Sequence, residues 1–538
     1  MYKAFLIFLF SASALLPQVV FEPEYSSVYN FLNRLALKEV VVLNDEIRPL
    51  SRLLIAEKLI EAECNLEELT SVERKELIYY KKDFEPEILI LRESEKKETV
   101  IFNDNNDFGF RPFLYRDKNF TFTADPVLGF EYNNFHYDNE RLRFNGLSFH
   151  GYYDNIGYSF YFRDNEISGN SIDLERKISP LPGIVRHSFD GENLQFSFVR
   201  GSVSYSWSWG SFDFSKEDII WGSGRRGQLI LSSKPPSFPF IRLILKPVDW
   251  LQFQYVHGWL ESGVIDSNSF RYTLVNGRET YNHISKYIAA HIISLYPFKN
   301  FSFSLGESVI YSERLEPLYF IPVLFFRLAD HYNSDTGDNA QIFFNSVYKF
   351  YPLKSKIYGT FFIDELSITN LFKGGNLSSL GYTVGINFID PIIENSELII
   401  EYTRTDPFLY MNSNDVQLYS SHGYQLGHWI GSNADQFFIS LRKWIVRGLM
   451  INLWGEIVRK GQTELPKQQY ELPYPPVLYG ERFSMKTIGI EAEYEIFRKL
   501  FGKIYFNYSD ISDEEEGRTP GFKTGAGNNF GFTIGYGF

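Results

Sequence analysis

The chain of 538 residues has little of the long apolar sequence that a helical membrane protein contains. Its mean hydropathy is −0.21, whereas each membrane-spanning helix needs roughly twenty consecutive apolar residues. A polytopic helical membrane protein is therefore excluded. A membrane β-barrel is not excluded, because only alternate residues of a barrel strand face lipid.

Cysteine and positive charge are also scarce. Cys64 is the only cysteine, so no intramolecular disulfide can form. It lies far from the amino terminus, which excludes the acylated cysteine of a lipoprotein, and we expect it to be a small buried residue of a helix. The net charge of −13 argues against a nucleic-acid partner, because such a partner requires a basic surface.

Motifs for metal or catalytic chemistry are missing as well. The nine histidines show no metal-binding spacing, and no nucleophile elbow of the G-x-S-x-G type occurs. The sequence therefore predicts no metal, no cofactor and no catalytic residue.

The first residues have the pattern of an export signal. Lys3 supplies a positive charge, residues 4–10 are apolar, and Ala12-Ser13-Ala14 provides the small residues of a cleavage site. We predict a signal peptide over residues 1–20, with cleavage after Ala14 as the candidate position. An uncleaved anchor is the alternative, which Pro17 disfavours because it interrupts the apolar run.

Residues 21–95 have the periodicity of a small helical bundle. The residues Val28, Phe31, Leu32 and Leu35 fall on one face of a helix, and Ser26 or Ser27 could cap it. A second helix is expected from Pro49. The pair Thr70 and Glu73 has the spacing of a capping box for a third helix. The polar residues 96–107 are predicted to be a linker.

From residue 108 to residue 538 the period changes to two. Val203, Tyr205, Trp207 and Trp209 alternate with serine and glycine, and several other segments repeat this pattern. A soluble β-sandwich also alternates, but its apolar face is usually rich in aliphatic residues. Here the apolar face is dominated by aromatic residues, which is typical of a lipid-facing wall. The prediction is a large antiparallel transmembrane β-barrel, with room for about 16 to 20 strands.

The end of the sequence supports this prediction. Phe530, Phe532, Ile534, Tyr536 and Phe538 alternate with small residues. A terminal amphipathic strand ending in an aromatic residue resembles the signal that the outer-membrane insertion machinery reads. We therefore expect Phe538 to be the insertion signal, with that machinery and outer-membrane lipids as partners.

One distinctive segment spans residues 221–247. Its glycines and arginines could suggest a phosphate-binding loop, but such a loop needs a following helix, which the prolines exclude. We interpret the segment as a buried loop that folds into the barrel, with its arginines paired to inward-facing carboxylates. Its characteristic residues are Trp221, Gly222, Gly224, Arg225, Arg226 and Pro236.

With these residues, the chain resembles the capsule assembly Wzi family of outer-membrane proteins. The resemblance also includes residues 31–35, 48–52, 310–322, 338–339, 406–410 and 426–435, in this order. It implies an 18-stranded barrel with a helical bundle at its periplasmic end. It further implies a non-enzymatic protein that holds capsular or another surface polysaccharide at the cell exterior.

A long segment, residues 403–436, has the composition of a glycan-binding loop. Aromatic rings can stack on sugars while carboxylates and amides bond to hydroxyls. The candidate residues are Tyr410, Tyr424, Trp429, Asp406 and Gln425. Anchoring of these rings at the membrane interface is an equal alternative. For the whole protein, a porin-like diffusion channel and, less favoured, an outer-membrane lipid-modifying enzyme are the rival functions.

Overall fold

The computed structural model describes residues 19–94, 96–105, 109–136, 138–272, 279–328, 338–364, 379–462 and 473–537. Residues 1–18, which contain most of the predicted signal peptide, lie outside this part of the chain, as does the predicted insertion signal, Phe538.

The predicted helical bundle contains α1 (Val28–Leu37), α2 (Arg52–Glu63), α3 (Ser71–Asp83) and α4 (Glu85–Leu91). The predicted apolar face of α1 is confirmed, because Phe31, Leu32 and Leu35 are buried in a core shared with the other helices. The capping box is also present. The Thr70 hydroxyl accepts a hydrogen bond from the Glu73 amide at 3.2 Å, and the Glu73 carboxylate accepts one from the Thr70 amide at 2.9 Å.

Several local predictions for these helices are wrong. The second helix begins at Arg52 instead of Pro49, because the Ser51 hydroxyl accepts a hydrogen bond from the Leu54 amide at 3.2 Å and caps the helix there. Ser27 holds the N-cap position of α1, but its side chain makes no capping bond. Cys64 is exposed at the end of α2. None of the described helices is long and apolar enough to cross a membrane.

Within the described residues, eighteen antiparallel strands close into the barrel, which confirms the predicted fold. Each strand pairs with its neighbours, and β27 closes the wall against β4. The strands in wall order are β4 (Phe120–Phe135), β5 (Asp138–Tyr153), β6 (Ile156–Gly169), β8 (Asn193–Trp207), β9 (Gly210–Glu217), β11 (Phe238–Val248), β12 (Leu251–Ile265), β15 (His283–Phe298), β16 (Phe301–Ser312), β17 (Asn339–Phe350), β18 (Ser355–Asp364), β19 (Ser379–Ile389), β20 (Ser396–Thr405), β23 (Ala434–Val446), β24 (Leu449–Lys460), β25 (Phe483–Phe497), β26 (Leu500–Asp513) and β27 (Gly525–Tyr536).

The predicted linker is instead part of a hairpin. Strand β2 (Glu98–Asn105) pairs with β3 (Gly109–Arg116), and β3 pairs with the first residues of β4. The barrel wall proper therefore begins at Phe120, later than the predicted residue 108. The polar composition of residues 96–107 suggested a solvated linker, but a short hairpin that extends beyond the wall also tolerates polar side chains.

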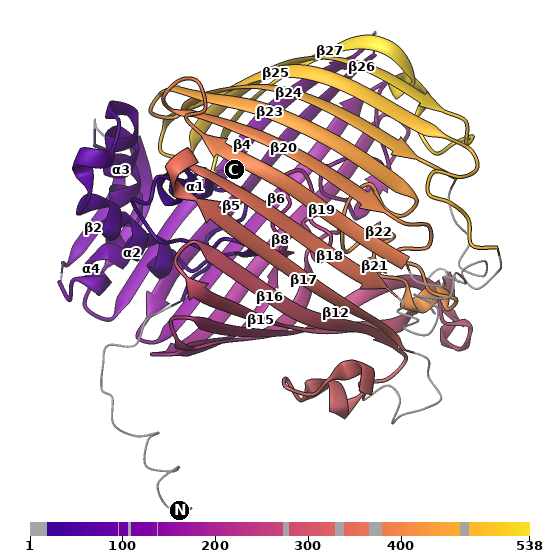
Figure 1. Ribbon diagram of the computed structural model, residues 1–538, viewed down its shortest axis with the longest axis horizontal. Helices are drawn as coiled ribbons and strands as arrows, with labels where there is room; N and C mark the ends of the chain where they lie inside the picture. Colours follow the sequence, from indigo (N-terminus) through magenta and orange to yellow (C-terminus); the bar gives the residue numbers. More distant parts are fainter. Residues whose placement is uncertain are drawn as a thin grey trace, which may run out of the picture.

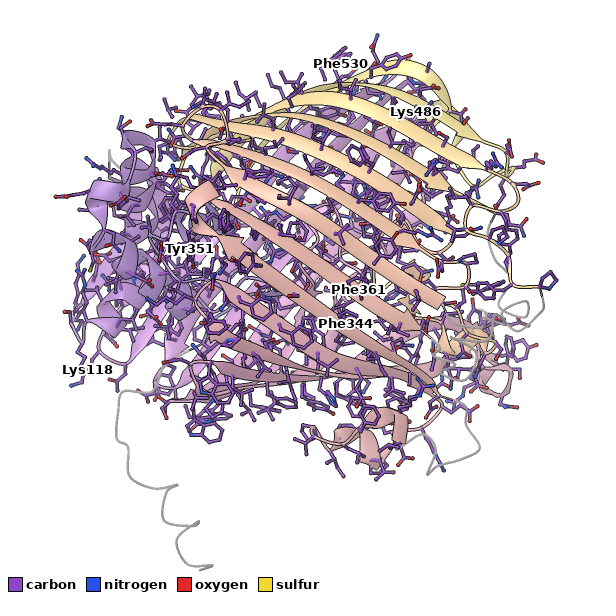
Figure 2. The ribbon with its side chains drawn as sticks, in the orientation of Figure 1. Lys118, Phe344, Tyr351, Phe361, Lys486 and Phe530 are labelled. Atoms are coloured by element: carbon purple, nitrogen blue, oxygen red, sulfur yellow. The ribbon has the colours of Figure 1, made fainter. Side chains whose placement is uncertain are left out.

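The wall has the alternation that the sequence predicts. Phe344 and Phe361 point outward from β17 and β18, where their rings stack at 4.8 Å between centroids. Phe530 of β27 is also exposed on the outside (Figure 2). The inward positions of the neighbouring strands carry serine, threonine and asparagine. The exposed apolar face is therefore the face that meets lipid.

The two ends of the barrel differ. Short connections such as 154–155, 208–209 and 498–499 lie at the end that carries the helices, whereas long connections lie at the opposite end (Figure 1). The helical bundle is fixed to the wall at several points around the barrel. The Tyr152 hydroxyl of β5 donates to Glu87 at 2.8 Å, and Lys356 of β18 donates to Asn33 at 2.7 Å. The bundle therefore covers this end of the lumen.

Candidate functional site

The connection between β9 and β11, residues 218–237, enters the barrel, and we call it inner loop 1. It runs across the lumen to the opposite wall. Trp221 packs against Phe343 of β17 with ring centroids 5.9 Å apart, and the Ser223 hydroxyl donates to Asn345 at 2.7 Å. Its short strand β10 (Ile220–Trp221) pairs with β1 (Ile47–Arg48) from the helical region. Inner loop 1 therefore joins the bundle, the lumen and the wall.

The two arginines of inner loop 1 pair with wall carboxylates, as predicted. The amides of Arg225 and Arg226 donate to Glu401 of β20 at 2.6 and 2.9 Å. The Arg226 guanidinium makes two bonds of 2.8 Å to Glu456 of β24. The Arg225 guanidinium lies 3.6 Å from Glu397. Buried charges paired in this way hold the loop in one position.

Steric constraints explain why two positions of this loop are glycine. Gly222 has a φ of +121°, which residues with a side chain rarely adopt. A Cβ at Gly224 would lie 1.9 Å from the carbonyl oxygen of Gly227. The loop can therefore make its turn only with glycine at these positions. Pro236, near the end of the loop, is buried.

The connection between β20 and β23, residues 406–433, also folds into the barrel, and we call it inner loop 2. It is bound to inner loop 1 by aromatic side chains. The Tyr410 hydroxyl donates to the Leu229 carbonyl at 2.8 Å, and the Trp429 indole donates to the Arg226 carbonyl at 3.0 Å. The segment predicted to be a glycan-binding loop is thus bound to inner loop 1 inside the barrel.

Three of the predicted glycan-binding residues are buried inside the barrel. Tyr410, Tyr424 and Trp429 are only 0%, 8% and 5% exposed, so their faces are not open to a polymer at the surface. Asp406 and Gln425 are half-buried. The composition of the loop could not distinguish rings that stack on sugar from rings whose polar atoms bind main-chain carbonyls inside the barrel.

Where the two inner loops approach the amino-terminal segment, a cavity of about 310 Å³ remains. This volume is at the lower end of the range for ligand pockets. Trp429, Arg225 and Arg226 are the predicted residues that meet here. The cavity is also lined by Glu24, Tyr25, Arg48, Gln228, Lys234 and Arg442, among others.

Cationic side chains are numerous in the lining of this cavity, and the arginines among them also contact Glu24, Glu397 or Glu456. Five of its described lining residues are arginine or lysine, while Glu24 is the only carboxylate among them. The Nε atoms of Arg48 and Arg442 are buried and have no hydrogen-bond partner within the described residues.

Two ionisable side chains of the inner loops, Lys234 and His428, have lowered pKa values. The Lys234 ammonium donates to the carbonyls of Ser179 and Leu181 at 2.8 and 3.0 Å, and burial lowers its pKa to about 7. Burial, with a smaller effect of Arg226, lowers the pKa of His428 to about 3. At neutral pH His428 is therefore uncharged, while Lys234 is near its midpoint.

Sequence reasoning missed Lys234, Gln228, Arg48 and Arg442 as lining residues. Lys234 and Gln228 lie within the distinctive segment, and Arg48 lies within residues 48–52, so the family resemblance marked their neighbourhood. No pattern in the sequence indicated that β23, which carries Arg442, would meet the amino-terminal segment there.

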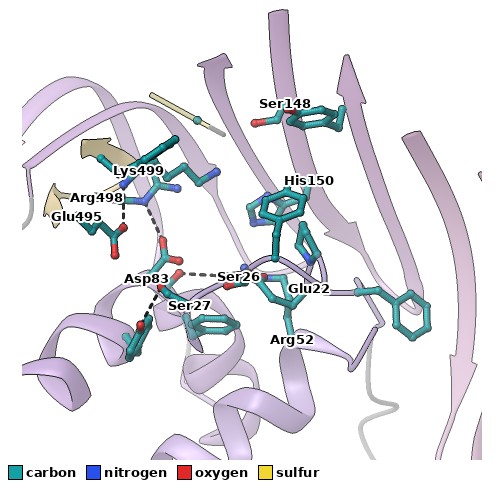
Figure 3. Close-up of a pocket in the computed structure, with 18 of the residues that line it drawn as sticks. Glu22, Ser26, Ser27, Arg52, Asp83, Ser148, His150, Glu495, Arg498 and Lys499 are labelled. Atoms are coloured by element: carbon teal, nitrogen blue, oxygen red, sulfur yellow. Dashed lines mark hydrogen bonds and ion pairs between the residues drawn. The ribbon is translucent and has the colours of Figure 1, made fainter. Parts of the chain in front are cut away.

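A second cavity of about 310 Å³ lies between the helical bundle and the wall. Figure 3 shows Arg498, in the turn between β25 and β26, directed toward Asp83 at the end of α3. The Arg498 guanidinium donates to Asp83 at 2.8 Å and to Asp125 of β4 at 2.6 Å. This network fixes the bundle to the barrel.

The fold and the site define a transmembrane β-barrel whose lumen is crossed by two of its own loops and covered at one end by helices. The profile of the family "Capsule assembly protein Wzi" matches residues 136–512, which is more than half of the chain. The chain therefore belongs to the capsule assembly protein Wzi family. The description of this family gives it a role in capsule assembly. This role agrees with the prediction of a non-enzymatic protein.

One solved structure shows the same fold. The chain is similar to Wzi of Escherichia coli, described as an outer-membrane protein involved in group 1 capsule assembly and a carbohydrate-binding β-barrel. The TM-score is 0.59 at 12% identity, over 98% of this chain and 100% of that one. OprD of Pseudomonas aeruginosa gives a TM-score of 0.41 at 13% identity, over 82% and 97%. No curated protein sequence matches the chain.

Proposed function

We propose that this protein binds a surface polysaccharide from the outer membrane and helps to hold it at the cell exterior. The helical bundle lies in the periplasm, and the long connections face outward, because outer-membrane barrels have short periplasmic turns and longer extracellular loops. The capsule assembly family and the carbohydrate binding stated for the Escherichia coli protein support this proposal.

The main observation that supports the proposed function is the cavity between the inner loops, which is lined by several cationic side chains. Trp429 supplies an aromatic edge, Gln228 an amide, and the surrounding arginines supply charged donors. Arginine forms paired hydrogen bonds with carboxylate and phosphate groups, so we infer that the cavity takes acidic sugar units. Several weak contacts along a repeating polymer add up through multivalency.

The test is binding of purified surface polysaccharide from the producing strain, together with retention of that polysaccharide on cells. Lys234→Gln removes a cation from the cavity, and Trp429→Leu removes the ring. We expect each change to weaken binding about threefold to tenfold, which corresponds to the loss of one contact.

The matched control is Lys486→Gln, since Lys486 is an exposed lysine of β25 outside the lumen (Figure 2). It should bind polysaccharide like the unchanged protein. All variants must show the heat-dependent gel mobility of a closed barrel. Equal binding by Lys234→Gln, Trp429→Leu and Lys486→Gln would exclude the cavity as the contact. Absence of binding by the unchanged protein would overturn the proposed function.

A further inference from the structure

The barrel wall has a notch on the side of the long connections. Strand β9 ends at Glu217, and the first pair between β11 and β12 joins Phe240 to Gly258. Beyond these residues one edge of β8 stays paired with β6, and within the described residues the edge on the side of β9 pairs only with the short strand β7 (Arg186–Phe189). Residues 259–265 of β12 have no strand partner on that side within the described residues.

Inner loop 2 contacts the free edge of β12. The His422 amide donates to the Glu261 carbonyl at 3.1 Å, and the Glu261 amide donates to the Ser421 hydroxyl at 3.2 Å. These bonds satisfy the main chain of Glu261 where the neighbouring strand is missing, and they place residues 421–422 of inner loop 2 at this edge of the gap.

In front of inner loop 2, a cavity of about 360 Å³ opens between the two strand edges. Its lining comes mainly from β8, β11, β12 and the end of inner loop 1. The lining includes Phe198, Val199, Pro236, Phe238, Trp259 and Leu260.

The notch begins where the lipid-facing belt ends. On β8 the outward side chains change from Tyr205, Val203 and Val199, all exposed and apolar, to the polar Ser197. On β9 the outward Phe212 and Phe214 are followed in the same phase by a lysine, Lys216. The cavity is therefore continuous with the lipid-facing surface and lies at its outer boundary.

The cavity combines an apolar wall with a positive edge. Lys216 lies at this edge, and its ammonium donates to the Val199 carbonyl at 2.9 Å and to the Ser237 hydroxyl at 2.8 Å. His187 and His422 also line the cavity. Glu261 is the only carboxylate among the described lining residues, and it already contacts His283 at 2.6 Å.

We propose that this notch binds an outer-leaflet glycolipid, with its phosphorylated sugar headgroup at Lys216 and Trp259 and its acyl chains along the belt below. Aromatic rings and lysines are the residues that meet headgroups at a membrane interface. The site is separate from the cationic cavity of the lumen, so it does not depend on the proposed polysaccharide contact.

The test uses lipid A, a phosphorylated diglucosamine glycolipid, as the probe. The full chain is purified in detergent, and bound lipid A is measured by native mass spectrometry. Ser197→Trp fills the notch from β8. Val203→Trp places the same ring on the same strand, but on the lipid-facing belt outside the notch.

We expect Ser197→Trp to retain about tenfold less lipid A than Val203→Trp, and Lys216→Gln to lose binding as well. Equal retention by the two tryptophan variants would overturn the site. Equal binding of dephosphorylated lipid A would overturn the headgroup assignment, and equal binding of phosphatidylethanolamine would show a generic lipid contact only. Heat-dependent gel mobility checks that each variant is a closed barrel.

Discussion

At the scale of single residues, buried carboxylates determine where the inner loops lie. Glu401 of β20 accepts hydrogen bonds from the amides of Arg225 and Arg226 and, at 2.7 Å, from the Tyr358 hydroxyl. The sequence predicted that the arginines pair with carboxylates, because buried arginines require them. It could not predict which carboxylates, since those partners lie about 170 to 230 residues away in the chain.

Replacing Glu401 with alanine should loosen inner loop 1. Glu401→Ala leaves two main-chain amides and one hydroxyl buried without their acceptor, and we expect a loss of about 2 to 4 kcal/mol in the free energy of unfolding. Glu401→Gln keeps an acceptor oxygen and should cost less. Denaturant titration in detergent measures both. A loss for Glu401→Ala no larger than that for Glu401→Gln would contradict this account.

Lys234 should make polysaccharide binding depend on pH. Its pKa is lowered to about 7 by burial, so the cavity loses a positive charge as the pH rises from 6 to 8.5. Arg176, Asp173 and Lys523 act on Lys234 and should keep their charges over this range. The affinity for an acidic glycan should therefore fall about threefold to tenfold as the pH rises.

In Lys234→Gln this pH dependence should disappear, because the arginines of the cavity remain charged and His428 remains neutral throughout. Binding measured at several pH values for both proteins is the check. The same decrease in affinity in Lys234→Gln would assign it to another group.

At the scale of elements, regular patterns were predictable and long-range placement was not. The period of two identified the wall, and the period of 3.6 identified α1, because each pattern is a local consequence of burying one face. The hairpin of β2 and β3 was missed, since the polar residues at the end of β2 were interpreted as a linker although Val100, Ile101 and Phe102 precede them. The folding of residues 406–433 into the lumen was also missed. It depends on contacts between the tyrosines of inner loop 2 and the main-chain carbonyls of inner loop 1, which are distant in the sequence.

The docking of the helical bundle should depend on Arg498. This side chain bridges Asp83 of α3 and the buried Asp125 of β4. Removing one partner of a buried ion pair costs about 3 kcal/mol or more, so Arg498→Ala should increase hydrogen exchange in α3. Lys354→Ala is the matched control, because Lys354 is 47% exposed in its pair with Asp390 and exposed pairs contribute little. Equal exchange in the two variants would mean that Arg498 does not hold the bundle.

At the scale of the whole molecule, two barriers lie in series along the lumen. The helical bundle covers one end, and the two inner loops cross the interior. This arrangement opposes the porin-like alternative, because ions would have to pass both barriers. A test of conductance must therefore remove them separately and together.

The unchanged protein should show negligible conductance in planar bilayers. Replacing residues 222–233 of inner loop 1 and residues 407–432 of inner loop 2 with short glycine-serine linkers should leave conductance low, because the bundle still covers one end. Deleting residues 19–94 alone should also leave it low, because the inner loops remain. Only the variant with both changes should conduct, provided that heat-dependent gel mobility shows a closed barrel. High conductance of the unchanged protein would favour a diffusion channel, since neither barrier would then block the passage of ions.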